Sequence, residues 1–200
     1  MQAERQPEYP LLYSLQGFRY GELLLAEAER AAWGGAVEGE GSEACAQVAQ
    51  RAAQTLKWVE PQDWLLDIAL DHLTLARCAL YADLLHGRPP GEDAQQHTEA
   101  AVAGLRQAGD QDELPRGLLT RAWLRHCLDD LPGTQADLAE AQRIAERGGM
   151  KLHLADIALT RARLFNDKDA LKKARALIEE CGYERRLPEL KDAEAAGWAQ

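Results

Sequence analysis

Apolar residues recur at spacings of three and four along most of the chain, which is the period of one face of an α-helix. The stretch 62–85 shows the pattern most clearly. Its apolar face is formed by Leu66, Ala69, Leu70, Leu73, Ala76 and Leu80. We identify no stretch with the alternating pattern of a β-strand. The sequence therefore predicts an all-α fold.

Proline and glycine residues divide the chain into pieces of helix length. Between these breaks we expect eight helices, over 9–32, 43–58, 62–85, 92–107, 114–129, 134–146, 152–165 and 168–180, and a short final helix over about 188–196. Ser42 is expected to cap the second helix, because a serine hydroxyl accepts a hydrogen bond from a free backbone N–H. Most connections are short, so consecutive helices should be antiparallel neighbours.

The predicted helices pair into four hairpins. These span about 9–58, 62–107, 114–146 and 152–180. A repeat of roughly 35–50 residues is typical of helical solenoids, in which each hairpin packs against the next. We therefore expect residues 1–200 to form a single repeat domain that is closed by the helix over about 188–196.

The composition is that of an ordinary soluble helical protein. Of the 200 residues, 46% are hydrophobic, 28% charged and only 6% aromatic. A chain of this length buries roughly 70% of its unfolded surface and needs no disulfide or metal in order to fold. No apolar run approaches the length of about 18 residues that a membrane span needs. We expect no membrane association.

The spacing of the four cysteines indicates the cellular compartment. Cys45, Cys78, Cys127 and Cys181 are far apart in the sequence, and none of them forms a Cys-x-x-Cys pair. All four fall in predicted helices, where a reduced cysteine packs as a small apolar residue. Reduced thiols are typical of the cytoplasm. We therefore expect a cytoplasmic protein.

The net charge of -10 disfavours nucleic acid as a partner, because an acidic chain repels the phosphate backbone. The charge is uneven along the chain. Residues 1–100 hold 16 acidic and 7 basic residues, whereas residues 101–200 hold 17 and 16. The first half is therefore strongly acidic and the second nearly balanced.

The motifs that would indicate catalysis are absent. The chain has no G-x-x-x-x-G-K-[ST] loop, so it is not itself an ATPase, and no H-E-x-x-H pair. Asp67 and Asp71 share a helix face, but His72 is rotated by about 100° from it, which disfavours a metal site. Cys127 and His126 are adjacent in the sequence, so their side chains would also point about 100° apart on a helix, which disfavours a catalytic Cys-His dyad. We expect no catalytic residue, no cofactor and no bound metal.

Small residues recur where the helices of each hairpin would cross. In the first helices these are Gly17 followed by Tyr20, Ala76, Ala122, and Ala162 followed by Phe165, and in the second helices Ala53, Ala101, Ala141 and Ala174. Helix axes 8–10 Å apart leave room only for small side chains. This pattern resembles the tetratricopeptide repeat, with an insertion at 86–92 and a shortened turn at Asn166-Asp167. The resemblance implies a right-handed superhelical solenoid of about four hairpins.

Three further segments extend the resemblance. The stretches 12–18, 67–73 and 177–186 are similar to the C-terminal tetratricopeptide arrays of bacterial STAND-type regulatory ATPases of the NB-ARC or NACHT class. This similarity implies a sensing or regulatory module of a larger bacterial signalling ATPase. Its expected function is that of a non-catalytic scaffold that binds a protein or peptide.

The resemblance also implies a set of ligand-binding residues. In tetratricopeptide arrays the first helices line the concave groove, and the residues just after the small crossing position, or one turn further on, point into it. Here these residues are Phe18, Arg77, Leu80, Trp123, His126 and Arg163. A lining of arginine and aromatic residues suits an acidic peptide or one that presents its C-terminal carboxylate.

Other interpretations of these residues and of the function stay open. Phe18 and Trp123 could belong to the core between repeats, with the arginines facing solvent beside salt-bridge partners. The chain could act as a homodimerisation module that has no external ligand, with the charge difference between its halves favouring a head-to-tail contact. A helical enzyme with a pocket between its layers is a third hypothesis, and it requires a buried group of shifted pKa.

Overall fold

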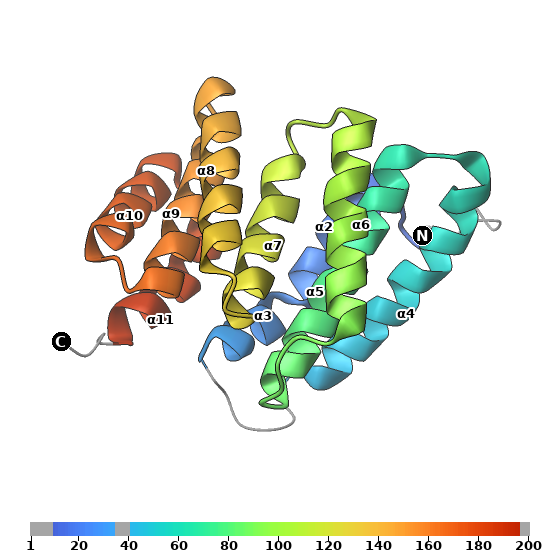
Figure 1. Cartoon of the computed structure of the whole chain (residues 1–200), viewed down its shortest axis with the longest axis horizontal. Helices are drawn as coiled ribbons and strands as arrows, with labels where there is room; N and C mark the ends of the chain where they lie inside the picture. The colour runs from blue at the N-terminus through green and yellow to red at the C-terminus, as the bar shows by residue number, and fades with distance from the viewer. Residues whose placement is uncertain (1–9, 35–40, 197–200) are drawn as a thin grey trace. The chain divides into compact units, whose positions relative to one another are not determined.

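The computed structural model of the chain describes residues 10–34 and 41–196. Within these ranges 83% of the residues are helical and none is in a strand. Ten α-helices, labelled α2 to α11 in Figure 1, and two short 3-10 helices make up this part of the chain. The predicted all-α class is confirmed.

Eight of the helices agree with the predicted boundaries to within three residues. They are α4 (Ser42–Val59), α5 (Leu65–Leu85), α6 (Glu92–Ala108), α7 (Leu114–Cys127), α8 (Leu131–Arg147), α9 (Lys151–Phe165), α10 (Lys168–Cys181) and α11 (Leu187–Ala195). The 3-10 helices are η1 (Glu60–Gln62) and η2 (Glu184–Arg186). Proline stands at the start of α7, α8 and α11, where its missing N–H costs no hydrogen bond.

The first predicted helix is wrong as a single element. It consists of α2 (Ser14–Leu24) and α3 (Ala26–Gly34), which meet at Leu25. The hydrogen bonds continue through the junction, because the Leu25 N–H donates to the Gly21 carbonyl oxygen at 3.0 Å and Leu25 accepts from Glu29 at 2.8 Å. The predicted start at residue 9 lies outside the described residues.

Helix capping also differs from the prediction at Ser42. Ser42 is the first residue of α4, and Gly41 takes the cap position in a left-handed conformation (φ +96°) without a side-chain hydrogen bond. A Cβ atom on Gly41 would lie 2.9 Å from Ala28, so the close approach of α3 favours glycine there. Asp167 is a true cap, because its Oδ1 accepts from the N–H groups of Asp169 (3.1 Å) and Ala170 (2.9 Å).

The chain divides into two compact units, Met1–Gln111 and Asp112–Gln200, which we call the N-terminal and C-terminal units. The boundary falls between the second and third predicted hairpins. Helix α5 is central to the N-terminal unit, where it packs against α4 and α6 and also contacts α2 and α3. Both α2 and α3 contact α5 more extensively than they contact α4. The predicted pairing of the first helix with 43–58 is therefore a minor contact in this unit.

The packing of α5 against α6 depends on small residues, as the sequence predicts. A Cβ atom on Gly104 of α6 would lie 2.9 Å from the Cβ atom of Ala69 of α5. Ala76 and Ala101, which the sequence places at helix crossings, are completely buried. In α4, however, the alanine that is buried is Ala52, and the predicted Ala53 is only partly buried.

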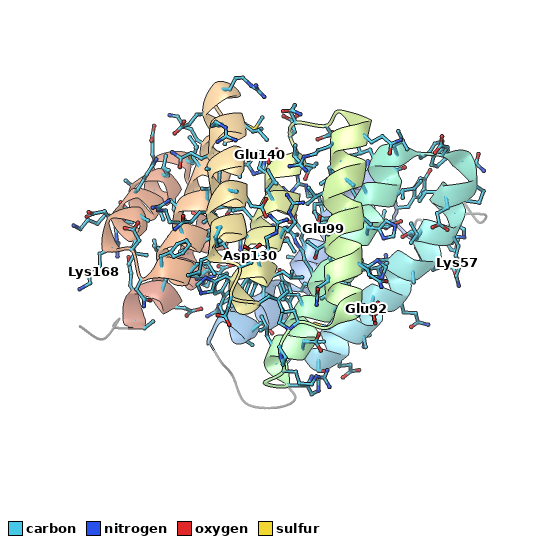
Figure 2. The ribbon with its side chains drawn as sticks, viewed as in Figure 1. Lys57, Glu92, Glu99, Asp130, Glu140 and Lys168 are labelled. Carbon is cyan, nitrogen blue, oxygen red and sulfur yellow. The ribbon has the colours of Figure 1, made fainter. Side chains whose placement is uncertain are left out.

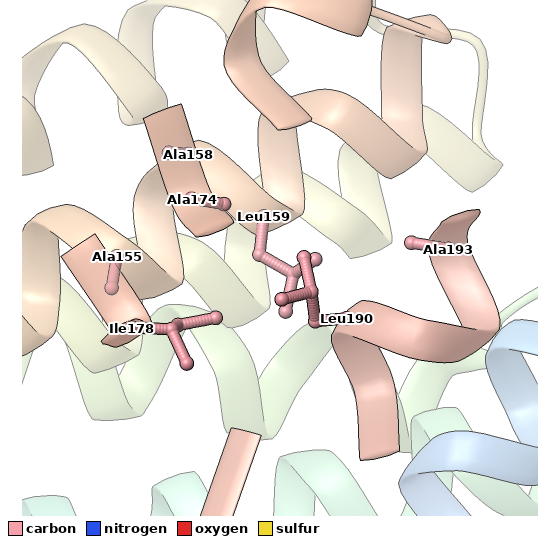
Figure 3. Packing of buried hydrophobic residues seen from close by; sticks show 7 residues of the cluster. All are labelled: Ala155, Ala158, Leu159, Ala174, Ile178, Leu190 and Ala193. Atoms are coloured by element: carbon pink, nitrogen blue, oxygen red, sulfur yellow. The ribbon is translucent and has the colours of Figure 1, made fainter. Parts of the chain in front are cut away.

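In the C-terminal unit α7 pairs with α8 and α9 with α10, and α9 also contacts α7, α8 and α11. Figure 3 shows the apolar cluster through which α9, α10 and α11 meet. Its buried members are Ala155, Ala158, Leu159, Ala174, Ile178, Leu190 and Ala193. A buried leucine or isoleucine stabilises a fold by about 1.5–3 kcal/mol. This cluster makes α11 an integral part of the unit.

Across the described ranges, no helix combines the length and the apolar character that crossing a membrane requires.

Candidate functional site

Three of the residues predicted to line a groove lie in the N-terminal unit, and two of them are buried. Phe18 is 3% exposed and Leu80 is fully buried, so neither presents its side chain to an open surface. The Arg77 guanidinium lies over the Phe18 ring at 5.4 Å from the centroid, and its Nη1 donates to Oε1 of Glu22 at 2.8 Å. Arg77 thus joins α5 to α2, and its side chain is only 12% exposed.

The other three predicted residues also make contacts within their own unit. Trp123 is 6% exposed, which corrects the expectation of an open aromatic wall. The ring of His126 meets the Phe165 ring edge-on at 5.7 Å. Nη2 of Arg163 donates to the Glu189 carbonyl oxygen at 2.9 Å and so connects α9 to α11. Whether any of the six residues contacts a ligand stays a prediction.

The N-terminal unit contains a pocket of about 300 Å³ beside α5, which we call the N-terminal pocket. Helix α4 contributes one wall, α5 the floor, and the first two turns of α6 the rim. The lining residues are Ser42, Cys45, Ala46 and Ala49 from α4, Leu75, Cys78, Ala79 and Ala82 from α5, and Asp93 and His97 from α6.

The C-terminal unit contains a pocket of about 260 Å³ beside α9, which we call the C-terminal pocket. Its lining residues are Gln142 from α8, Leu154, Ile157, Ala158 and Arg161 from α9, Asp167 from the turn, and Asp169, Ala170 and Lys173 from α10. As in the N-terminal pocket, one helix of a hairpin forms the floor, its partner helix contributes the rim, and the helix that precedes the hairpin closes one side.

The two pockets are lined in the same register. Each α9 lining residue stands 79 positions after its α5 counterpart, so that Leu75, Cys78, Ala79 and Ala82 match Leu154, Ile157, Ala158 and Arg161. On the rim, Asp93 and His97 match Asp169 and Lys173, which are the second and sixth residues of α6 and α10. The sequence Leu-Ala-x-x-Ala-Leu is common to 75–80 and 154–159.

This register gives a second candidate for the small crossing residue of α9 and identifies a signal that the sequence offered. Ala155 stands at the position equivalent to Ala76, whereas the repeat pattern selected Ala162, and both α9 alanines are fully buried. In this register the residue after the crossing position is Asp156 in α9. The repeated Leu-Ala-x-x-Ala-Leu marks this register in the sequence, but it contains only part of each pocket lining.

The two thiols of the N-terminal pocket are neutral. Cys45 and Cys78 are 2% and 3% exposed, and neither is in a disulfide. Burial raises the pKa of the Cys45 thiol to about 11 and also raises the pKa of Cys78. Both side chains therefore carry their proton at neutral pH and do not act as nucleophiles, and at 2% and 3% exposure they add only a small apolar surface to the pocket.

His97, on the rim of the same pocket, is paired with His72 of α5. Their Nδ1 atoms are 2.9 Å apart and their ring centroids 5.1 Å apart. Such a contact needs one Nδ1 to donate and the other to accept, so the two atoms share one proton. Burial and the neighbouring His97 ring lower the pKa of His72. Of the lining residues, all of which lie in the described part of the chain, Asp93 alone has a carboxylate.

The rim of the C-terminal pocket carries charges of both signs. Nε of Arg161 donates to Oδ2 of Asp167 at 3.0 Å. The backbone N–H of Ala170 and the Arg161 side chain lower the pKa of Asp167, which keeps its carboxylate charged. Lys173 and Asp169 complete the rim, both exposed. Arg161 and Lys173 stand at the positions that Ala82 and His97 occupy in the N-terminal pocket.

Each unit also buries charged groups away from its pocket. In the N-terminal unit, Oδ1 of Asp71 accepts from the Thr55 hydroxyl at 2.7 Å, and Oδ2 is buried without a hydrogen bond. Burial raises the pKa of Asp71 to about 7. In the C-terminal unit, Arg186 donates to Asp156 at 2.8 Å and to Glu189 at 2.9 Å, and this ion cluster joins α9, η2 and α11.

Among the described residues, no three or more His, Cys, Asp and Glu side chains are grouped so that they could hold a metal ion. The chemistry that the two pockets offer is therefore an apolar floor of alanine and leucine with a rim of hydrogen-bonding and charged groups.

Comparison of the chain with protein-family models, with characterised proteins and with solved structures finds no match.

Proposed function

We propose that this chain is a non-catalytic helical-repeat scaffold that binds a protein or peptide, and that the two pockets receive side chains of that partner. The observation that carries the proposal is the repetition of one lining pattern, in the same register, in both units. A site that recurs with the hairpin is characteristic of repeat scaffolds, whose binding surface is built from equivalent positions of successive repeats.

The size and character of the pockets support a polypeptide ligand. At about 300 and 260 Å³ they are at the lower end of ligand-pocket volumes, so each accommodates one large side chain. Pockets of this kind bind a single side chain weakly, and each further contact that the same peptide makes is intramolecular and adds affinity. The rim groups would then select the residues next to the inserted side chain.

The finer identity that we propose is a right-handed solenoid of tetratricopeptide-like hairpins that forms the cytoplasmic sensor module of a larger bacterial signalling ATPase. Two hairpins per 79 residues give a repeat of about 40, longer than the 34 of the tetratricopeptide consensus. The insertion at 86–92 accounts for part of the difference. The proposed acidic or carboxylate-bearing ligand fits the C-terminal pocket better than the N-terminal one, since basic residues, Arg161 and Lys173, stand beside Asp167 and Asp169 on its rim.

Selection of peptides from a random phage-displayed library tests the proposal. Peptides selected on the wild-type chain should bind at least tenfold more weakly to the double variant Ala79→Leu and Ala158→Leu, because the two leucines fill the pockets. Circular dichroism of the variant controls for folding. Selected peptides that bind the filled and wild-type chains equally well would overturn the proposal.

Self-association is a second candidate function, favoured by the apolar surface of α2. Leu23 is 64% exposed, and Leu15, Tyr20 and Leu24 on the same helix are exposed as well. Exposed apolar residues grouped in this way are typical of protein contacts. Light scattering at low and high salt should report a dimer mass that Leu23→Glu converts to the monomer mass. A monomer at all protein concentrations would exclude this candidate.

A further inference from the structure

We infer that the N-terminal pocket binds an aromatic side chain that is flanked by basic residues in the partner peptide. The inference rests on the proposed function and specifies the ligand of one of its two sites. Three features of the pocket carry it: its shape, its two buried thiols and the sign of the charge on its rim.

The shape follows from four alanines that face the space from two helices. Ala46 and Ala49 lie on α4, and Ala79 and Ala82 on α5. Their methyl groups leave about 300 Å³ empty between the helix backbones. One large side chain fills a space of this size, and an aromatic ring does so with little loss of conformational freedom, because it has only two rotatable bonds.

The thiols favour an aromatic occupant over an aliphatic one. Cys45 lies on the α4 wall and Cys78 on the α5 floor, and the raised pKa of each keeps its sulfur protonated and uncharged. Sulfur makes favourable contacts with the edges of aromatic rings. The C-terminal pocket has Ile157 at the position of Cys78, so this preference belongs to the N-terminal pocket.

The rim charge determines the flanking residues. Asp93 has the one carboxylate among the lining residues, which include no lysine or arginine. Glu92 and Glu99, labelled on α6 in Figure 2, are also exposed and add negative charge to the same helix. In the C-terminal pocket the equivalent rim carries Arg161 and Lys173 together with Asp167 and Asp169, so its formal charges balance. A basic peptide is therefore complementary to the N-terminal pocket, and electrostatic complementarity of this kind selects between partners.

Fluorescein-labelled peptides measured by anisotropy at low salt test the inference. The probe sequences are Gly-Lys-Trp-Lys-Gly, Gly-Glu-Trp-Glu-Gly, Gly-Lys-Leu-Lys-Gly and Gly-Lys-Ala-Lys-Gly, each with blocked ends. The Lys-Trp-Lys peptide should bind at least tenfold more tightly than the Glu-Trp-Glu and Lys-Ala-Lys peptides, and at least threefold more tightly than the Lys-Leu-Lys peptide. Equal affinity for the Lys-Trp-Lys and Glu-Trp-Glu peptides would overturn the inference.

Equivalent positions in the two pockets provide matched variants. Ala79→Leu should weaken binding of the Lys-Trp-Lys peptide at least tenfold, whereas Ala158→Leu should change it less than twofold. Asp93→Asn should weaken it about threefold, and Asp169→Asn, also at the second position of its helix, should leave it unchanged. An equal effect of the two members of either pair would place the peptide elsewhere. If Ala79→Leu fails to fold, Ala49→Leu fills the pocket from its other wall.

The outcomes separate this inference from the proposed function. If library-selected peptides respond to filling of the pockets but show no preference for aromatic and basic residues, the inference fails and the scaffold function stands. If no selected peptide responds to filling of either pocket, both fail.

Discussion

The helix pairs α5–α6 and α9–α10 build the same pocket and give it different chemistry. The floor residues follow one spacing in both, and Leu75 and Ala79 of α5 are matched by the identical residues Leu154 and Ala158 in α9. The rims differ, since Ala82 and His97 of the N-terminal pocket are replaced by Arg161 and Lys173 in the C-terminal pocket. Helix packing thus fixes where the space lies, and the few residues free of packing constraints determine what enters it.

The same comparison holds for a buried charge. The residue that follows the small crossing alanine is Arg77 in α5 and Asp156 in α9, of opposite sign. Arg77 pairs with Glu22 of α2 at 2.8 Å, and Asp156 pairs with Arg186 of η2 at 2.8 Å. In each unit this position anchors an element outside the hairpin. The repeat conserves the place of the anchor, whereas the sign of the charge depends on the partner.

The largest predicted effect concerns the anchor of the C-terminal unit. Arg186→Ala leaves the buried carboxylates of Asp156 and Glu189 without their shared cation, and loss of one partner from a buried ion pair costs about 3–5 kcal/mol. We expect the free energy of unfolding, measured in urea, to fall by this amount. Lys191→Ala, at an exposed position of α11, is the control. A fall of less than about 1 kcal/mol would show that the cluster does not anchor α11.

The matching change in the N-terminal unit should cost less. Arg77→Ala leaves Glu22 its contact with Arg19, whose Nη1 lies 3.1 Å from the other carboxylate oxygen. We expect a loss of about 1–3 kcal/mol in the same measurement, the cost of weakening a buried charge that keeps one partner. If the loss equalled or exceeded that of Arg186→Ala, the two anchors would not differ as their partners indicate.

The units should also respond to pH in opposite directions. Burial raises the pKa of Asp71 to about 7, so the folded N-terminal unit binds a proton that the unfolded chain releases above about pH 4. The contribution of Asp71 to stability is therefore largest at low pH and falls as the pH rises from about 4 to 7, by at most about 1.4 kcal/mol per pH unit. Asp167 has a lowered pKa, so its contribution is present above about pH 4 and is lost as the pH falls further.

Asp71→Asn tests this dependence, because asparagine can still accept from Thr55 and has no proton to release. The gain in unfolding free energy of the variant over the wild type should increase between pH 4 and 7. Asp63→Asn, at an exposed position, should show a constant difference. A constant difference for Asp71→Asn as well would mean that the carboxyl group is charged in the folded protein.

The smallest predicted effect compares two helix starts. Asp167→Ala removes the side chain that accepts two N–H groups at the start of α10, and should cost about 1 kcal/mol. Ser42→Ala should cost less than about 0.5 kcal/mol, because Ser42 is the first residue of α4 and the cap position belongs to Gly41. Thermal unfolding of the two variants checks this difference, and equal losses would contradict it.

The helices were predictable because glycine and proline interrupt a strong helical period. The same signals gave no indication of the junction at Leu25, which lies in an apolar run through which the hydrogen bonds continue. They misplaced the cap at Ser42, because the close contact between Gly41 and Ala28 comes from tertiary packing. Local patterns define helices, but contacts between helices determine where those helices bend and how they begin.

The candidate site was much less accessible from the sequence. Its lining consists mainly of alanine, leucine and cysteine, which any helix contact uses, and no single one of them indicates a pocket. Pairings such as Arg77 with Glu22 join residues 55 positions apart and follow no periodic rule. The buried state of Phe18 and Leu80 agreed with their apolar character, whereas the family resemblance assigned them to an open groove.

Alanine methyl groups give the most direct test of the central claim that the pockets beside α5 and α9 bind a polypeptide. In a chain labelled with ¹³C at the alanine methyl carbons, a library-selected peptide should shift the signals of Ala79 or Ala158, which line the pockets. Ala76 and Ala101, fully buried at helix crossings, should stay unchanged. Saturating peptide that shifts neither pocket methyl signal would contradict the claim.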